Sequence, residues 1–158
     1  MMNPSNRISK KALSVWRITG IIHSLIALLV PIGFFVLPFF LEGLHWFSYT
    51  ILFVWFVLAL FLVIIIPKLR WRKWWYEVRE QEIELQHGIL IVKNTLVPMI
   101  RVQHVDTVQG PILKKYGLAT IVISTAATSH EIPALAEEEA EQLRYSISRL
   151  ARVAEEDV

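Results

Sequence analysis

The side chains best suited to chemistry at neutral pH are five histidines: His23, His45, His87, His104 and His130. No two of them have the four-residue helical spacing that brings two imidazoles onto one metal ion. The chain has no cysteine, so a thiolate nucleophile, a Cys-based zinc site and a disulfide framework are excluded. The sequence therefore predicts no metal site and no cofactor.

His104 and Asp106 are the one pair that resembles part of an active site. They lie two residues apart in a predicted strand, so both side chains point the same way and the carboxylate could orient the imidazole. Ser124 lacks the Gly-x-Ser-x-Gly pattern of a nucleophile elbow, and residues 137–139 are three glutamates typical of a solvated first helical turn. We therefore predict no catalytic residues, with a membrane enzyme using His104 and Asp106 as an alternative.

Four polar side chains are better candidates for contact with a protein partner or a lipid: Arg101, Gln103, Lys114 and Lys115. Arg101 and Gln103 are expected on one strand face, opposite Val102 and His104. The two lysines fall in a predicted turn after Pro111. The alternative is that all four are ordinary solvated surface residues.

Two long apolar runs near the N-terminus are predicted to anchor the rest of the chain in a membrane. Residues 18–41 and residues 46–66 contain no Asp, Glu, Lys or Arg, and only residues 42–45 separate them. About 20 apolar helical residues cross a hydrocarbon core of about 30 Å, so we predict a transmembrane hairpin over residues 18–66. The first run is longer than a signal-peptide core and lacks small residues at a cleavage site, so we interpret it as a retained span.

Charge on the flanks predicts how the hairpin is oriented. Residues 1–17, a basic N-terminal arm, and residues 67–73 each carry a net charge of +4, whereas the tip between the spans carries one glutamate. The positive-inside rule then places both termini in the cytoplasm, in a multi-pass protein of the cell membrane. The remainder, from residue 74 onward, has a net charge of −5, so the overall +2 does not indicate nucleic-acid binding.

Aromatic and basic residues at the ends of the runs are the expected interface anchors: Trp16, Arg17, Trp46, Trp71, Arg72, Trp74 and Trp75. The basic and aromatic juxtamembrane segment, residues 67–76, could also suggest a nucleic-acid surface, but its position directly after a span favours anionic headgroups. Pro67 is expected to end the second span.

Three residues inside the spans need an explanation of their own. Pro31 predicts a kink in the first span. His23 is expected as a neutral imidazole bonded to a carbonyl or a headgroup, although intramembrane polar residues often mark a function. Trp55 falls in mid-span, where it faces lipid or packs on another helix, and it is a candidate partner contact.

Residues 77–158 predict a small all-β domain with a C-terminal helix. Strands are expected around residues 83–86, 89–92, 100–109, 118–124 and 129–132, with a helical turn at 111–116. Pro133 is expected to open a helix over about residues 135–154, which has an apolar stripe of helical period. Short connections favour an antiparallel sandwich or barrel whose open end the helix covers.

Several strings in this region resemble one family: GI at 88–89, LVPMIRVQHV at 96–105, QGPILKKYGLA at 109–119, IVISTA at 121–126 and IPAL at 132–135. They resemble the bacterial pleckstrin-homology (PH)-like domains of small membrane proteins. The resemblance implies a PH-like sandwich capped by a C-terminal helix. It also implies a larger membrane protein with repeated PH-like domains as partner, and it supplies no catalytic residues.

The sequence thus predicts a non-enzymatic membrane protein that presents a cytoplasmic PH-like domain for assembly in a membrane complex. Its biological output would be envelope-stress tolerance or resistance to a toxic peptide. The alternative from another class is a module that recognises anionic lipid of the inner leaflet through Arg101, Lys114 and Lys115.

Overall fold

The computed structural model describes residues 6–36 and 45–156, which form two units. The helical unit is Trp16–Leu69, and the domain unit combines Met1–Val15 with Arg70–Val158. The predicted tip at residues 42–45 lies outside the described residues except for His45, where the backbone of the next helix begins.

The described residues of the two apolar runs are mainly helical, as predicted. The helices are α1 (Ala12–Ala27), α2 (Leu29–Val36), α3 (His45–Leu60) and α4 (Ile66–Lys73), with a π-helical turn at Phe61–Ile65 joining the last two. Together they make two segments, Ala12–Val36 and Trp46–Lys73, of 25 and 28 residues, which are long and apolar enough to cross a membrane.

The two prolines act differently from each other. Pro31 has no N–H to donate to the carbonyl of Ala27, and the helix is interrupted at Leu28, close to the predicted kink. Pro67, the predicted end of the second span, does not end the helix, because α4 continues through it to Lys73. The wider π-helical turn directly before Pro67 relieves the clash that a proline ring makes with the preceding turn.

Within the helical unit the two segments contact each other at several places, including an edge-to-face contact between the rings of Phe35 and Tyr49. Gly20 lies so near the second segment that an added Cβ would sit 3.2 Å from the carbonyl oxygen of Leu62. The Trp55 indole N–H donates a hydrogen bond of 3.1 Å to the carbonyl of Ser24. Trp55 therefore joins the two helices, which was one of its two predicted roles.

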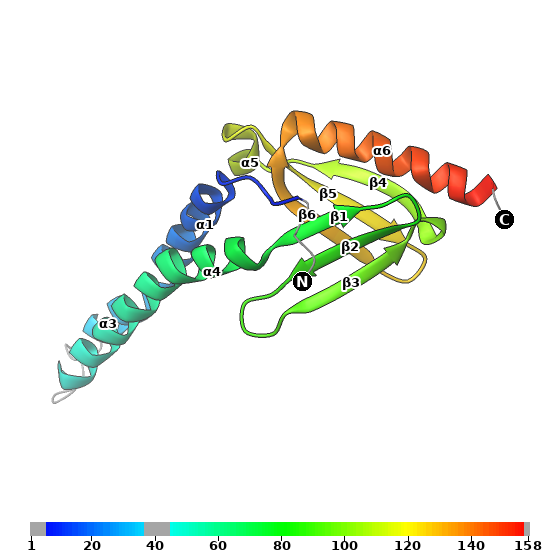
Figure 1. The fold of residues 1–158 in the computed structure, drawn as a ribbon. Helices are drawn as coiled ribbons and strands as arrows, with labels where there is room; N and C mark the ends of the chain where they lie inside the picture. The colour runs from blue at the N-terminus through cyan, green and yellow to red at the C-terminus, as the bar shows by residue number, and fades with distance from the viewer. Residues whose placement is uncertain (1–5, 37–44, 157–158) are drawn as a thin grey trace. The chain divides into compact units, whose positions relative to one another are not determined.

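Two antiparallel three-stranded sheets make up the domain (Figure 1). The first has the order β1-β2-β3 and the second the order β4-β5-β6. The strands are β1 (Trp75–Val78), β2 (Glu82–His87), β3 (Lys93–Pro98), β4 (Val102–Val108), β5 (Leu118–Thr125) and β6 (Ser129–Ala136). The short helix α5 (Pro111–Lys115) precedes β5 and ends before Gly117, whose φ of +63° suits glycine.

The C-terminal helix α6 (Glu137–Glu156) packs chiefly against the second sheet, along β4 (Figure 1). Its predicted apolar stripe faces the core, with Ala140 and Ile147 fully buried. From the strands, Tyr76, Leu85 and Ile121 complete the same core. The predicted order, two membrane-length helices followed by a small β-domain of two sheets with a C-terminal helix, is confirmed.

Several element boundaries differ from the predictions. Residues 89–92 form a loop between β2 and β3 instead of a strand. Pro133 does not open a helix, because β6 runs on to Ala136 and α6 begins at Glu137. Pro133 is tolerated because β6 is an edge strand and the pairing with β5 shifts register there, with Ala134 at a φ of +54°.

The N-terminal arm is part of the domain unit. Tyr76 donates its backbone N–H to the carbonyl of Asn6, forming an isolated β-bridge at the outer edge of β1. Ser9 donates its N–H to Ala134, and the Trp71 indole N–H donates to the carbonyl of Ile8. Because Ile8 is also buried, residues 6–9 are an integral part of the fold, whereas a separate basic arm was predicted.

Candidate interaction surface

A groove opens on the domain between the end of β3 and the β5–β6 turn. Its volume is about 840 Å³, and it is lined by the last residues of β3, the 3-10 turn Met99–Arg101, the start of β4 and the end of α6. Leu96 and Ile100 face the groove with about half of their surface exposed. The residues that line it therefore include large apolar side chains in contact with water.

Arg101 and Gln103 both line this groove, so the structure brings these two predicted contact residues together. The predicted alternation of faces is wrong in detail. Arg101 belongs to the 3-10 turn, and the pairing of β4 with β5 shifts register between Val102 and His104. A bulge of this kind changes which side chains share a face, and the sequence alone did not reveal it.

Lys114 and Lys115 are exposed on α5 and are not among the residues that line the groove. The four predicted contact residues therefore do not form one patch. An anionic headgroup held jointly by Arg101 and these lysines has no common pocket among the described residues.

The outer edge of β3 is a second feature of the groove. Among the described strands β3 pairs with β2 alone, and Leu96, Val97 and Pro98 from its end line the groove. An unpaired edge presents backbone N–H and C=O groups that can pair with another extended segment. The equivalent outer edge of β1 is partly covered by Asn6.

His104 and Asp106 share a face, as predicted, with the imidazole Nε2 3.8 Å from a carboxylate oxygen of Asp106. Both side chains are more than half exposed. Ser124 is engaged with the hydroxyl of Ser129 at 3.2 Å. Within the described residues no group of three His, Cys, Asp or Glu side chains could hold a metal ion. The pair lacks the enclosed setting and third group of a catalytic site.

A smaller pocket of about 350 Å³ gathers basic groups where β2, β3 and β6 approach one another. Arg70, His87, Lys93 and His130 line it, together with Glu131. The pKa of His87 is lowered by burial first and then by the positive charges of Lys93, Arg70 and His130. The His87 Nδ1 atom is buried and has no hydrogen-bond partner among the described residues. The pocket thus carries local positive potential.

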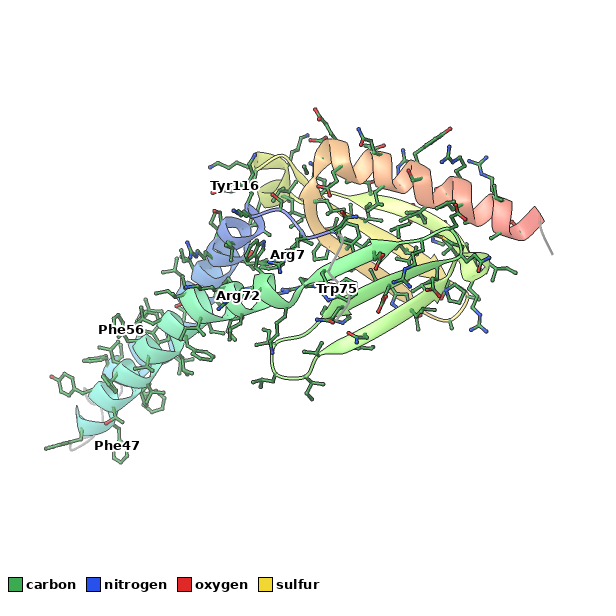
Figure 2. The ribbon with its side chains drawn as sticks, viewed as in Figure 1. Arg7, Phe47, Phe56, Arg72, Trp75 and Tyr116 are labelled. Carbon is green, nitrogen blue, oxygen red and sulfur yellow. The ribbon has the colours of Figure 1, made fainter. Side chains whose placement is uncertain are left out.

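The predicted interface anchors lie in different settings. Trp46, Arg17 and Arg72 are exposed, and Trp16, Trp71 and Trp75 are partly buried. Exposed aromatic side chains of α3, such as Phe47 and Phe56, surround that helix (Figure 2). Trp74 is 5% exposed and stacks on His87 with ring centroids 5.9 Å apart, so its assignment as a lipid anchor is wrong.

Polar residues of the spans have ordinary partners. The His23 Nδ1–H donates to the carbonyl of Thr19 one helical turn earlier, at 2.8 Å, which is the expected bond to a carbonyl. Trp55 is engaged with Ser24 inside the hairpin, which removes its indole N–H from the groups that a partner could use.

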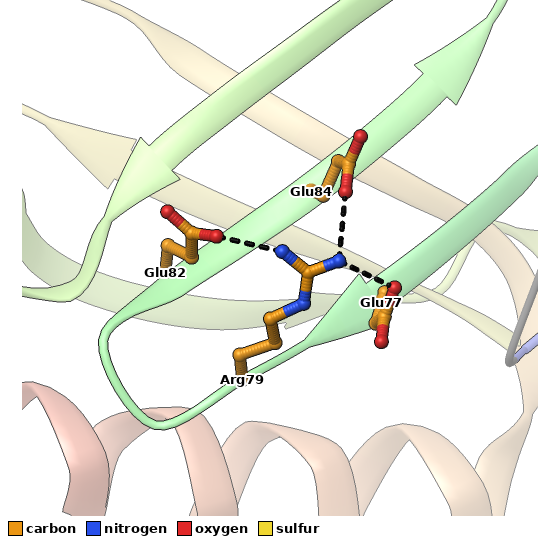
Figure 3. Close-up of polar contacts among 4 residues, drawn as sticks. All are labelled: Glu77, Arg79, Glu82 and Glu84. Carbon is orange, nitrogen blue, oxygen red and sulfur yellow. Dashed lines mark hydrogen bonds and ion pairs between the residues drawn. The ribbon is translucent and has the colours of Figure 1, made fainter. Parts of the chain in front are cut away.

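An ion-pair cluster closes the turn between β1 and β2. Arg79 contacts Glu77, Glu82 and Glu84 at 3.0, 2.7 and 3.2 Å (Figure 3). The hydrogen bonds that Arg79 donates to Glu77 and then to Glu82 raise the pKa of Arg79 above its ordinary value. The three carboxylates outnumber the one guanidinium, so this end of the domain disfavours an anionic ligand.

A carboxylate of the first turn of α6 also has a structural role, because Glu139 accepts a hydrogen bond of 2.8 Å from the buried Tyr76 hydroxyl.

Two apolar helices followed by a pair of three-stranded sheets and a C-terminal helix define a class, a membrane protein with a PH-like domain. The chain belongs to the bacterial PH domain family, which it matches over residues 17–151. The resemblance inferred from the sequence is thereby confirmed.

Two relatives in Bacillus subtilis (strain 168) are similar to the chain. It is 54% identical over 155 residues to the UPF0699 transmembrane protein YdbS, and the match covers 98% of each chain. It is 25% identical over 101 residues to the UPF0699 transmembrane protein YdbT, covering 61% of this chain and 19% of that protein. No solved structure gives a significant match. The transmembrane relatives and the two apolar helices together indicate a membrane protein.

Proposed function

We propose that this is a non-enzymatic membrane protein whose PH-like domain binds another membrane protein through the groove beside β3. The observation that carries the proposal is the free edge of β3 lying next to the exposed Leu96 and Ile100. The flanking charges support two spans with both termini and the domain in the cytoplasm.

The groove suits an extended segment added to β3. The backbone of β3 would supply hydrogen bonds, and the apolar groove residues would select the side chains of the segment. Arg101 and Gln103 would stand at the rim of this contact, where polar groups favour specificity. Pro98 ends the strand and has no N–H, so the added segment would pair along the residues before it.

We choose a longer protein of the same family as the partner. The match to YdbT covers less than a fifth of that protein, so a similar segment occurs there within a much longer chain. A partner with repeated PH-like domains would offer similar sheets, and therefore similar strand edges, to the groove. This choice agrees with what the sequence resemblance implies.

Purification in mild detergent tests the assembly. The full chain, expressed with the longer family protein of the same organism, should co-purify with it. Leu96→Lys should abolish co-purification, because a lysine on an edge strand opposes strand addition and its charge would be desolvated in the groove. Val108→Lys is the matched control, since Val108 is equally exposed on β4 but does not line the groove. Recovery of the wild-type chain alone would refute the assembly.

We place the output of the complex in envelope-stress tolerance or resistance to a toxic peptide. A strain lacking the gene should become more sensitive to membrane-active peptides, and wild type should restore tolerance while Leu96→Lys should not. Unchanged sensitivity of the deletion strain under envelope stress would remove this assignment.

A further inference from the structure

The loop between β2 and β3 exposes apolar side chains that no described residue covers. Leu90 is 94% exposed and Ile91 is 85% exposed, and they lie in the middle of a run of four apolar residues, 89–92. We call residues 88–92 the apolar loop. Single exposed apolar residues are common on proteins, but a run of neighbours this exposed indicates a surface that is covered by something.

The apolar loop has a defined conformation. Gly88 has a φ of +133°, and a Cβ at this position would lie 1.9 Å from the carbonyl oxygen of Ile91. Only glycine allows the backbone to close this tightly. Lys73 adds a second constraint, because its Nζ donates a hydrogen bond of 2.9 Å to the carbonyl of Ile89. The structure therefore holds Leu90 and Ile91 at the tip of a loop whose backbone conformation is fixed.

The hydrogen bond from Lys73 also places the loop next to the end of α4. Lys73 is the last residue of α4, which continues the second membrane-length segment without a break. The apolar loop is thus tied to the point where the chain leaves that segment. Basic residues surround the same point, with Arg72 exposed before Lys73, and Arg70 and Lys93 lining the basic pocket.

We propose that the apolar loop inserts Leu90 and Ile91 into the bilayer surface from which the second span emerges. Apolar side chains would enter the boundary between headgroups and acyl chains, and Lys73, Lys93 and Arg72 would remain at the level of anionic headgroups. This second attachment would hold the domain in one orientation on the membrane instead of leaving it free to turn about its tether.

The positive surroundings favour a lipid surface as the occupant. Lys93 follows the loop directly in the sequence, and Arg70 lines the same pocket as Lys93. No acidic residue lies within residues 86–93. The apolar tip matches the acyl chains of a bilayer, and the basic flanks match its anionic headgroups. If a protein covers the tip instead, the spin-label experiment will show protection that depends on that protein.

Spin labels on the full chain test the insertion directly, because the chain contains no cysteine. Leu90→Cys carries a nitroxide on the apolar loop, and Gln81→Cys carries one in the β1–β2 turn at the opposite end of β2. Each labelled protein is placed, one copy per disc, in nanodiscs of zwitterionic and anionic phospholipid. Relaxation by oxygen reports a lipid environment, and relaxation by a water-soluble nickel complex reports water.

The expected result is several-fold protection of the Leu90→Cys label from nickel, with high oxygen accessibility, while the Gln81→Cys label stays open to nickel. Lys73→Gln with Lys93→Gln should reduce the protection in anionic discs. Equal nickel accessibility at the two positions would overturn the proposal. Protection that appears only with two copies per disc, or only after the longer family protein is added, would overturn it in favour of a protein contact.

Discussion

The apolar loop and the strand that follows it both expose large apolar side chains, yet their surroundings differ. Leu90 stands at a glycine-closed tip, with Lys73 bonded to the neighbouring carbonyl of Ile89 and Lys93 following the loop in sequence. Leu96 stands beside an unpaired backbone edge, in a groove whose rim carries Arg101 and Gln103. Six residues apart in sequence, the two sites match two different occupants.

The difference shows that exposed apolar area alone does not identify what covers it. At the apolar loop the backbone is not a strand edge, and the chemistry is an apolar tip with positive flanks, which suits a lipid surface. At β3 there are backbone groups to satisfy and a shaped groove, which suit an extended protein segment. The β1–β2 turn differs from both sites, because its charged side chains, Arg79 and three glutamates, form ion pairs with one another.

The largest expected effect comes from breaking the conformation of the apolar loop. Gly88→Ala forces a Cβ against the carbonyl of Ile91 at a φ of +133°. We expect a loss of roughly 2 kcal/mol or more in the free energy of unfolding of the full chain in detergent, as for a residue held in a backbone region reserved for glycine. Denaturant titration followed by tryptophan fluorescence measures it.

Gly110→Ala provides the control for that change. Gly110 has an ordinary φ of −78° and no atom within 4 Å of an added Cβ, so we expect little change in stability. If Gly88→Ala were no more destabilising than Gly110→Ala, the conformation of the apolar loop would not depend on glycine. The apolar loop would then not differ from the β3 edge in the way described above.

A smaller effect is expected from pH at the base of the loop. Because burial and then the neighbouring cations Lys93, Arg70 and His130 lower the pKa of His87, the folded chain resists protonation that the unfolded chain accepts. Stability should therefore fall as pH decreases through the ordinary value of 6.5 toward the lower folded value. Thermal unfolding of wild type from pH 8 to pH 5 measures this slope.

His87→Gln should flatten that part of the pH dependence, whatever its effect on the absolute melting temperature. His104→Gln is the matched control, because His104 is exposed on β4 and should leave the slope unchanged. A slope that persists in His87→Gln would show that the positive potential beside the loop does not act through this imidazole.

The smallest effect on folding is expected from the two exposed leucines. Leu90→Ser and Leu96→Ser should each change the free energy of unfolding by less than about 0.5 kcal/mol, since exposed side chains contribute little to the core. Their functions should separate: Leu90→Ser should weaken the hold of the domain on the bilayer, and Leu96→Ser the co-purification of the partner. Loss of stability in either variant would show that its leucine is part of the core.

Local pattern was sufficient to predict the order of elements. Apolar runs without charge predicted both helices, and the stripe containing Ala140 and Ile147 predicted the buried face of α6. Features that depend on contacts distant in sequence were not predictable. The bridge from Asn6 to Tyr76, for example, needs the completed sheet.

The candidate surface was predictable in part. Arg101 and Gln103 were identified by type and position, but the bulge in β4 and the 3-10 turn decide where they point. The apolar loop was missed, because β-branched residues at 89–92 suggest a strand as strongly as an exposed tip. The available signal was Gly88 before the run and Lys93 after it, with no alternating polar residues between.

One measurement tests the central claim, that the two exposed apolar sites have different occupants. A photoreactive amino acid is placed at Leu90 or at Leu96 in the full chain, in cells that express the longer family protein, and adducts are resolved by mass. The account predicts a protein adduct from Leu96 and only lipid adducts from Leu90. A protein adduct from Leu90, with none from Leu96, would contradict it.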